Sequence, residues 1–137
     1  MINKISKILS ANDIGTTGSH QAGMFISKSD DVLQFFPKLD IAQKNPRAFL
    51  DIIDSEGALW ECAFIYYNNK FFGGTRNEYR LTRLQNMFKH FGIKPNDEMI
   101  MTVKNNASYQ IEFLKNKSIK TTMETITISN KWRVINI

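Results

Sequence analysis

The chain has 137 residues, a length that fits one domain with a buried core. With 42% hydrophobic and 12% aromatic residues, its composition excludes general disorder. The net charge of +5 is uneven: residues 1–69 hold six Lys or Arg against eight Asp or Glu, and residues 70–137 hold twelve against five. A basic half is typical of a surface that binds a polyanion, although proteins that never touch nucleic acid share such an excess.

The cysteine content disfavours a disulfide-bonded or thiolate-metal protein, and the hydropathy pattern disfavours a secreted or membrane-spanning one. Cys62 is the single cysteine, so we expect no disulfide within the chain and no thiolate metal cluster, only a core thiol in a reduced intracellular protein. The first residues lack the apolar region of a signal peptide, and no run approaches the ~18 apolar residues of a membrane span. We therefore expect no membrane association.

The N-terminal half begins with a predicted strand and a long loop. Alternating apolar residues predict the strand over 2–10, and Ser10–Gly23 is a polar, glycine-rich loop of a length that usually has a function. A helix is predicted over 30–36, with Ser29 as its N-cap and Pro37 as its end. Apolar runs around these elements predict three more strands, at 24–26, 48–53 and 59–67.

The segment Gly73–Arg80 follows the last of these strands and carries a polar alternation. If it is extended, the side chains of Arg76, Glu78 and Arg80 share one face, about 6.6–6.8 Å apart, close to two base-pair steps of DNA. Arginine pairs bidentately with guanine, and glutamate accepts a hydrogen bond from cytosine. The segment therefore suits a G·C-containing major groove. The alternative is a solvated strand face with cross-strand ion pairs.

A helix signal comes next. Thr82 is predicted as the N-cap, with Gln85 completing a capping box, and Gly92 ends the helix. One apolar stripe at helical spacing, predicted to be core, is formed by Leu84, Met87, Phe88 and Phe91.

The C-terminal part is predicted to be all β. Turn signals at Asn105-Asn106 and Asn116-Lys117 separate strands at 99–103, 109–114, 125–128 and 132–137. Short strands without a βαβ rhythm favour an antiparallel or mixed barrel. The predicted fold class is thus mainly β with two short helices (α+β) and seven or eight strands, in a single domain over 1–137.

No catalytic set is recognisable. A metal-dependent nuclease site would need carboxylates and a lysine together, and Asp97, Glu112 and Lys115 are the nearest candidates. In a strand, however, Glu112 and Lys115 point to opposite faces. His20 and His90 lack the spacing of a zinc site, and no phosphate-binding loop is present. The sequence predicts no catalytic residue and no metal site in this chain.

Residues that suit DNA binding are more prominent. His20 and Gln21 lie near the end of one glycine-rich loop, and Arg76–Arg80 follows another pair of glycines; these residue types read base edges. Phe25 and Tyr79 could contact a thymine methyl group or a base face. For Phe25 the alternative is packing in the core.

Two segments resemble the N-terminal domain of the EcoRII restriction endonuclease family. Residues 10–23, SANDIGTTGSHQAG, resemble the family's SANDxGATGGHQxG, and IYYN at 65–68 with FGGTRNEYRLTR at 72–83 resembles IYYN and FGKTRNEKRITR. The two motifs have the same order and a similar separation. This resemblance implies a DNA-binding pseudobarrel like the plant B-three domain, whose two arms clamp duplex DNA and read the major groove.

The resemblance also implies residue roles. The first arm's base readers correspond to His20 and Phe25, and the second arm's to Arg76, Glu78 and Arg80. Further DNA contacts are expected, less specifically, from Ser19, Gln21, Lys28, Thr75, Asn77, Tyr79 and Arg83. The family has lysines where this chain has Gly74 and Tyr79, which leaves the recognition sequence open.

The family further implies a biological role. In a type IIE restriction endonuclease of a restriction-modification system, this effector domain binds a second copy of the site, 5′-CCWGG with W as A or T, and relieves autoinhibition of a separate nuclease domain. We expect a monomeric domain in the prokaryotic cytoplasm. It needs no cofactor for binding, and Mg²⁺ serves only a nuclease domain of the parent, which is not within this chain. Two alternatives stay open: a complete small nuclease, and an interaction module that does not bind DNA.

Overall fold

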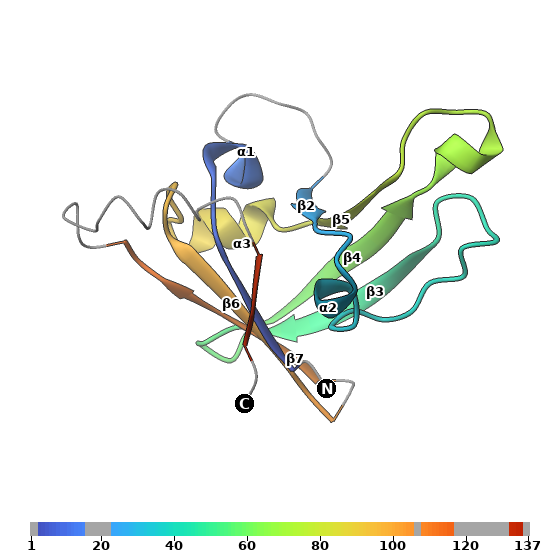
Figure 1. Cartoon of the computed structure of the whole chain (residues 1–137). Helices are drawn as coiled ribbons and strands as arrows, with labels where there is room; N and C mark the ends of the chain where they lie inside the picture. The colour runs from blue at the N-terminus through green and yellow to red at the C-terminus, as the bar shows by residue number, and fades with distance from the viewer. Residues whose placement is uncertain (1–2, 16–22, 106–107, 117–131, 136–137) are drawn as a thin grey trace.

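The fold is an eight-stranded sheet that curls into a nearly closed barrel (Figure 1). The computed structural model describes residues 3–15, 23–105, 108–116 and 132–135. The sheet order is β2-β5-β4-β3-β7-β6-β1-β8, and every pairing is antiparallel except that of β3 with β7. The strands are β1 (Lys4–Ile8), β2 (Met24–Ile26), β3 (Arg47–Ile53), β4 (Leu59–Tyr67), β5 (Glu78–Thr82), β6 (Glu98–Lys104), β7 (Ser108–Leu114) and β8 (Trp132–Ile135).

Two short contacts hold the sheet in its curled form. The parallel pairing of β3 with β7 joins the half β2-β5-β4-β3 to the half β7-β6-β1-β8 through Ile52 and Ile53. The two end strands meet where Trp132 Nε1 on β8 donates a hydrogen bond of 3.2 Å to the Phe25 carbonyl oxygen on β2. The prediction of a mainly β, mixed barrel is therefore confirmed.

The helices are short: α1 (Ala11–Ile14), α2 (Asp30–Leu33), α3 (Gln85–His90) and the 3-10 turn η1 (Asn69–Phe72). Ser29 caps α2 as predicted. The first part of the predicted loop 10–23 is instead helical in α1. Ser10 Oγ accepts from Asp13 N at 3.2 Å, and Asp13 Oδ2 accepts from Ser10 N at 2.9 Å, a reciprocal capping box.

The predicted capping box at Thr82 and Gln85 is wrong. Thr82 belongs to β5, where its hydroxyl donates to the Ala63 carbonyl oxygen at 3.3 Å, and α3 begins at Gln85 without a side-chain cap. Pairing with β4 has thus overridden the local cap signal. The apolar stripe was correctly predicted as core, since Met87 and Phe88 are buried. Gly92, at a φ of 60°, follows the end of the helix.

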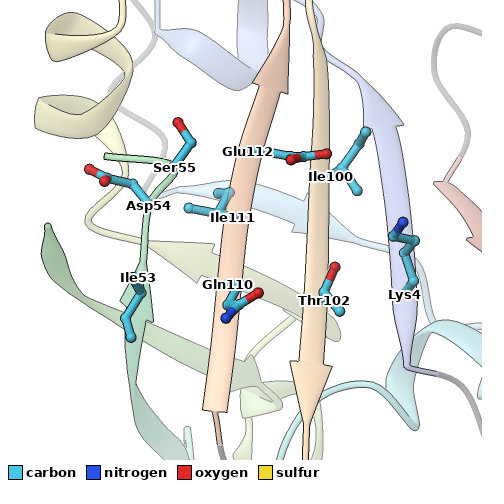
Figure 2. Close-up of a pocket in the computed structure, with 9 residues that line it drawn as sticks. All are labelled: Lys4, Ile53, Asp54, Ser55, Ile100, Thr102, Gln110, Ile111 and Glu112. Atoms are coloured by element: carbon cyan, nitrogen blue, oxygen red, sulfur yellow. The ribbon is translucent and has the colours of Figure 1, made fainter. Parts of the chain in front are cut away.

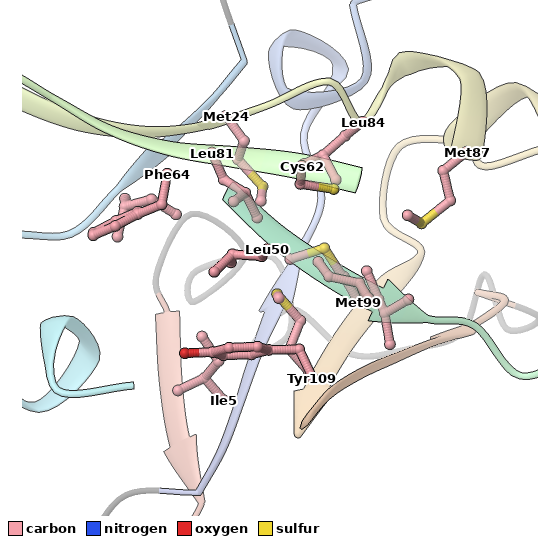
Figure 3. Packing of buried hydrophobic residues seen from close by; sticks show 14 of the residues in the cluster. Ile5, Met24, Leu50, Cys62, Phe64, Leu81, Leu84, Met87, Met99 and Tyr109 are labelled. Carbon is pink, nitrogen blue, oxygen red and sulfur yellow. The ribbon is translucent and has the colours of Figure 1, made fainter. Parts of the chain in front are cut away.

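The core fills the barrel between the sheet and α3 (Figure 3). Cys62 has no exposed surface, and burial raises the pKa of its thiol to about 12, which fits the predicted inert core cysteine. The predicted strand 125–128 lies outside the described residues. Within the part of the chain that the structure describes, no helix is long and apolar enough to cross a membrane.

Candidate nucleic-acid interface

β4, η1 and β5 form an arm that extends from the barrel, with η1 at its end (Figure 1). The turn depends on Asn69, whose carbonyl oxygen accepts from Gly74 N at 2.7 Å and whose Oδ1 accepts from Arg76 N at 2.6 Å. A Cβ atom on Gly74 would lie 2.7 Å from the Asn69 side chain. Gly74 therefore allows Asn69 to hold the backbone just before β5, which gives a structural reason for one departure from the family motif.

Arg76, Glu78 and Arg80 lie together at the start of β5, as the alternation predicts; we call them the Arg-Glu-Arg cluster. Glu78 Oε2 accepts from Arg76 Nη2 at 3.0 Å and also from Arg80 Nε. Their side chains are 36%, 24% and 15% exposed for Arg76, Glu78 and Arg80 respectively. One carboxylate thus orients two guanidinium groups on a partly open surface.

The protonation state of Glu78 follows from this contact. Partial burial raises the pKa of Glu78, but the hydrogen bonds and positive charges of Arg80 and Arg76 outweigh that effect and leave the pKa below its ordinary value of 4.5. Glu78 is therefore ionised at neutral pH, and the cluster carries one net positive charge. This charge state suits contacts to both acceptor and donor groups of bases.

Aromatic rings flank both arginines of the cluster. The Arg76 guanidinium lies 3.9 Å from the ring centroid of Tyr67 on β4, and that of Arg80 lies 6.0 Å from the ring of Phe25 on β2. Phe25 pairs with Arg80 across the strands and is 46% exposed. The alternative in which Phe25 is a core residue is wrong, because its neighbours Met24 and Ile26 fill the core instead.

The first glycine-rich loop ends beside β5. Arg80 Nη1 donates to the Gly23 carbonyl oxygen at 2.9 Å, and a Cβ on Gly23 would lie 2.3 Å from the Leu81 carbonyl oxygen. Before the loop, a Cβ on Gly15 would lie 2.6 Å from the side chain of Gln85, at the start of α3. The C-terminal end of the loop thus lies at the cluster. The predicted contact residues Ser19, His20 and Gln21 lie outside the described residues.

The other predicted contact residues on β2 and the arm differ in availability. Lys28 and Thr75 are exposed. Asn77 accepts a 2.6 Å hydrogen bond from the Tyr66 hydroxyl. The Tyr79 ring stacks on Tyr66 at 4.1 Å, away from the cluster, since it lies between Glu78 and Arg80 in β5 and points to the opposite face. Burial raises the pKa of Tyr79, as expected of a packing residue.

Arg83 lies just beyond β5 with a φ of 69° and is engaged within the protein. Its Nη1 is 2.8 Å from Glu61 Oε1, and its guanidinium lies 5.1 Å from the Phe49 ring centroid. Two residues that the sequence analysis missed are Tyr67 and Asn69, which position Arg76. The sequence partly indicated Asn69, because the Asn68-Asn69 pair is typical of a turn. It did not indicate that this turn positions Arg76.

The candidate nuclease residues do not form a site. Asp97 is buried and accepts from Lys94 N and Asn116 N, each at 2.8 Å, and Lys115 Nζ lies 3.4 Å away. Glu112 points to the other face of β7, towards Ile100, in a shallow pocket of about 260 Å³ (Figure 2). Across the described residues, no three His, Cys, Asp or Glu side chains are grouped as metal ligands.

Comparison with known proteins identifies the family. A family model described as "Restriction endonuclease EcoRII, N-terminal" matches residues 2–110. The chain belongs to the EcoRII N-terminal family. Within this family, a curated relative is the type II restriction enzyme EcoRII of Escherichia coli, which is 45% identical over 85 residues, covering 56% of this chain. The chain spans only 20% of that relative's length.

Solved structures share the fold of this EcoRII N-terminal family member. An Arabidopsis FUS3–DNA complex matches with a TM-score of 0.63 and 18% identity, covering 82% of this chain and 96% of that one. The B3 domain of the UbaLAI restriction endonuclease, solved with cognate DNA, matches with a TM-score of 0.58 and 18% identity, covering 96% and 86%. At these identities the likeness shows a common B3-type pseudobarrel fold.

Proposed function

We propose that this chain binds double-stranded DNA in a sequence-specific manner, as the recognition domain of an EcoRII-like restriction enzyme. The observation that carries the proposal is the Arg-Glu-Arg cluster, which is partly exposed and lies beside exposed Phe25 and the C-terminal end of the first loop at Gly23. Base edges in the major groove offer the acceptors and donors that such a cluster matches. The net charge of residues 70–137 adds attraction to phosphates.

Each member of the cluster has a distinct part in this proposal. Arg76 is the most exposed and takes the bidentate contact to guanine O6 and N7. Glu78 orients both arginines and accepts from cytosine N4. Arg80 uses Nε for Glu78 and Nη1 for the Gly23 carbonyl oxygen, which leaves donors for a base, because a guanidinium has five N–H groups. His20 and Phe25 read from the first arm. The expected site is short, G·C-containing and similar to 5′-CCWGG.

The similar proteins support this function. The Escherichia coli relative is a type II restriction enzyme, and the UbaLAI and FUS3 structures contain DNA. Because the chain spans a fifth of the restriction enzyme's length, the cleavage activity of a parent protein is itself part of the proposal. We propose that Mg²⁺-dependent cleavage resides in a separate nuclease domain of the parent, which this single domain controls as a type IIE effector, and that the isolated domain is monomeric.

A binding selection on randomised duplex DNA, at fixed salt, tests the function directly. We expect enrichment of one short G·C-containing sequence, since affinity that is purely electrostatic selects none. No enrichment at any salt would favour a module that does not recognise DNA. Plasmid cleavage with Mg²⁺ that Asp97→Ala or Glu112→Ala abolishes would replace the proposal with a complete nuclease.

Arg76→Ala tests the proposed base contact on the selected duplex. We expect a loss of about 1–3 kcal/mol in binding free energy on this duplex and little loss on random DNA, the usual result for a bidentate base contact. Fluorescence anisotropy on both duplexes measures the difference. The matched control is Arg133→Ala, which removes the same charge from an exposed position on β8. Equal losses for Arg76→Ala on both duplexes would show that Arg76 contacts only phosphate.

A further inference from the structure

The end of the arm carries two exposed phenylalanines that none of the roles above explains. Phe71 and Phe72, in η1, are 65% and 45% exposed. Within the described residues, neither ring takes part in an aromatic or cation–π contact. Figure 1 shows η1 at the far end of the β4–β5 arm, away from the barrel. Two apolar rings are thus held out into solvent.

The backbone under these rings is tightly held. Lys70 N donates to the Arg76 carbonyl oxygen at 2.9 Å, and Phe71 N donates to the Asn68 carbonyl oxygen at 3.0 Å. The buried Asn68 side chain also accepts from Asn45 N at 2.7 Å and donates to the Gln43 carbonyl oxygen at 2.8 Å, which ties the arm to the preceding loop. These contacts hold the backbone from which the two rings project.

Leaving the rings exposed forgoes stabilisation of the fold. Burial of a phenylalanine side chain stabilises a fold, and that gain is absent where the side chain remains in water. Contiguous exposed apolar groups with polar residues around them mark binding surfaces, whereas single scattered ones do not. The two rings therefore fit a surface that is covered when a partner binds.

Charge indicates which partner covers the rings. Residues 68–78 contain Lys70, Arg76 and Glu78 as their charged side chains, so this end of the arm carries one net positive charge, with Glu78 paired to Arg76. A second copy of the chain would place like charges together, whereas DNA supplies negative phosphates. The Lys70–Arg76 backbone contact also makes the turn continuous with the Arg-Glu-Arg cluster.

We propose that Phe71 and Phe72 form an apolar contact to thymine C5-methyl groups in the major groove, next to the base pairs read by the Arg-Glu-Arg cluster. The thymine methyl is the apolar group that the major groove presents, and phenylalanine is among the residues that contact it. Together with the arginines, the two rings would favour a thymine at the edge of a G·C-containing site. This proposal rests on the proposed function and extends it to a further specificity contact.

The test compares methyl removal on the DNA with ring removal on the protein. The probe is the duplex from the selection, with each thymine replaced in turn by uracil, which lacks only the methyl group. For the unaltered chain, uracil at one or two positions is expected to weaken binding about 3- to 10-fold, consistent with the small end of base discrimination energies. The double variant Phe71→Ala/Phe72→Ala is expected to bind the thymine duplex that much more weakly and to lose its sensitivity to uracil.

Leu59→Ala is the matched control. Leu59 is 64% exposed, much like Phe71, but it lies at the opposite end of β4, some 25–30 Å away along the strand. We expect Leu59→Ala to bind and to discriminate thymine from uracil as the unaltered chain does. Urea denaturation of all variants checks the fold, and unchanged midpoints are expected because the truncated side chains are exposed.

Several outcomes would each overturn the proposal. The first is equal sensitivity to uracil in the unaltered chain and in the double variant. The second is weaker binding by the double variant together with loss of a 2-aminopurine unstacking signal, which would show a wedge between bases. The third is a concentration-dependent dimer, in sedimentation without DNA, that the double variant lacks. If Arg76→Ala loses selective binding while the double variant keeps it, only this inference fails; if the unaltered chain selects no sequence, the proposed function itself fails.

Discussion

Glu78 and Asp97 are both carboxylates with cationic partners and lowered pKa values, yet their surroundings differ. Glu78 accepts from two arginine side chains and is 24% exposed. Asp97 is 5% exposed and accepts from two backbone N–H groups as well as from Lys115. For Asp97, burial raises the pKa, and the hydrogen bonds from Asn116 N, Lys94 N and Lys115 outweigh that effect.

The kind of hydrogen-bond partner distinguishes Glu78, a candidate binding residue, from Asp97, a structural one. The partners of Asp97 are backbone groups that would be left unpaired if it turned elsewhere, so its role is to join the turn before β6 to the end of β7. The partners of Glu78 are side chains on an open face, which can exchange this contact for one with a base. A charged cluster is therefore a better candidate for recognition when its partners are side chains.

Asp97→Ala should give the largest effect, and on stability alone. Removing the acceptor of two backbone donors is expected to lower the free energy of unfolding by about 3 kcal/mol, since hydrogen bonds to charged groups contribute about 1.5–3 kcal/mol each. Urea denaturation measures this loss. Affinity for the selected duplex should stay unchanged under conditions where the variant is folded. A loss of affinity in the folded variant would contradict a purely structural role.

Glu78→Gln should give the opposite result. The amide keeps an acceptor oxygen but not the charge, so the hydrogen bonds that orient Arg76 and Arg80 weaken, and affinity for the selected duplex is expected to fall about 10-fold, or about 1.4 kcal/mol. The free energy of unfolding should change by less than about 1 kcal/mol, as is usual for exposed ion pairs.

Glu61→Gln is the control for this variant. It breaks another Arg–Glu pair, that of Glu61 with Arg83, which is more exposed than the Glu78 contacts. We expect it to leave affinity for the selected duplex unchanged. If Glu78→Gln altered only stability, Glu78 would belong with Asp97 as a structural residue.

The smallest expected effect is on the pH dependence of the free energy of unfolding, to which Asp97 and Glu78 both contribute. Both carboxylates have folded-state pKa values below their ordinary values of 3.8 and 4.5, so the native state binds fewer protons than the unfolded state in acid. Their stabilisation is present above the unfolded pKa and is lost as the pH falls through the folded pKa. Urea titrations from about pH 6 to pH 2 should show this loss.

Neutral variants of the two residues, Asp97→Asn and Glu78→Gln, measure how much of this acid-induced loss of stability each carboxylate causes. Asp97→Asn is expected to flatten the acid dependence more than Glu78→Gln does, because Asp97 is buried and Glu78 is screened by solvent. Equal flattening by the two variants would contradict the distinction drawn between them.

The sequence was most informative where a short pattern and the tertiary structure agree. The alternation of Arg76, Glu78 and Arg80 was enough to predict their common face, and Ser29 was enough to predict the start of α2. Glu112 and Lys115 were correctly predicted not to form a metal site together, since Glu112 lies in β7 beside Ile100 whereas Lys115 lies beyond the end of β7 and contacts Asp97. These features depend on residues that are close in the chain.

Predictions failed where a distant partner decides. Thr82 has the chemistry of an N-cap, but pairing with Ala63 on β4 keeps it in a strand. One local signal was also missed: Ser10 caps α1 with Asp13 in place of the usual glutamate, and the glycines that follow hid it. The orientation of Tyr79 could have been predicted, since any residue between Glu78 and Arg80 in a strand points away from them. The need for a small residue at Gly74 could not, because it depends on how Asn69 folds back.

The division of the barrel into two half-sheets has a consequence for the folding pathway. The half β2-β5-β4-β3 is built from one continuous stretch of chain, whereas β1 must find β6 from the opposite side of that stretch. Closing a long loop costs conformational entropy before any distant contact compensates for it, so local pairings form at lower cost. The half that carries the Arg-Glu-Arg cluster is thus expected to assemble first, and the arrival of β1 and β8 completes the native state.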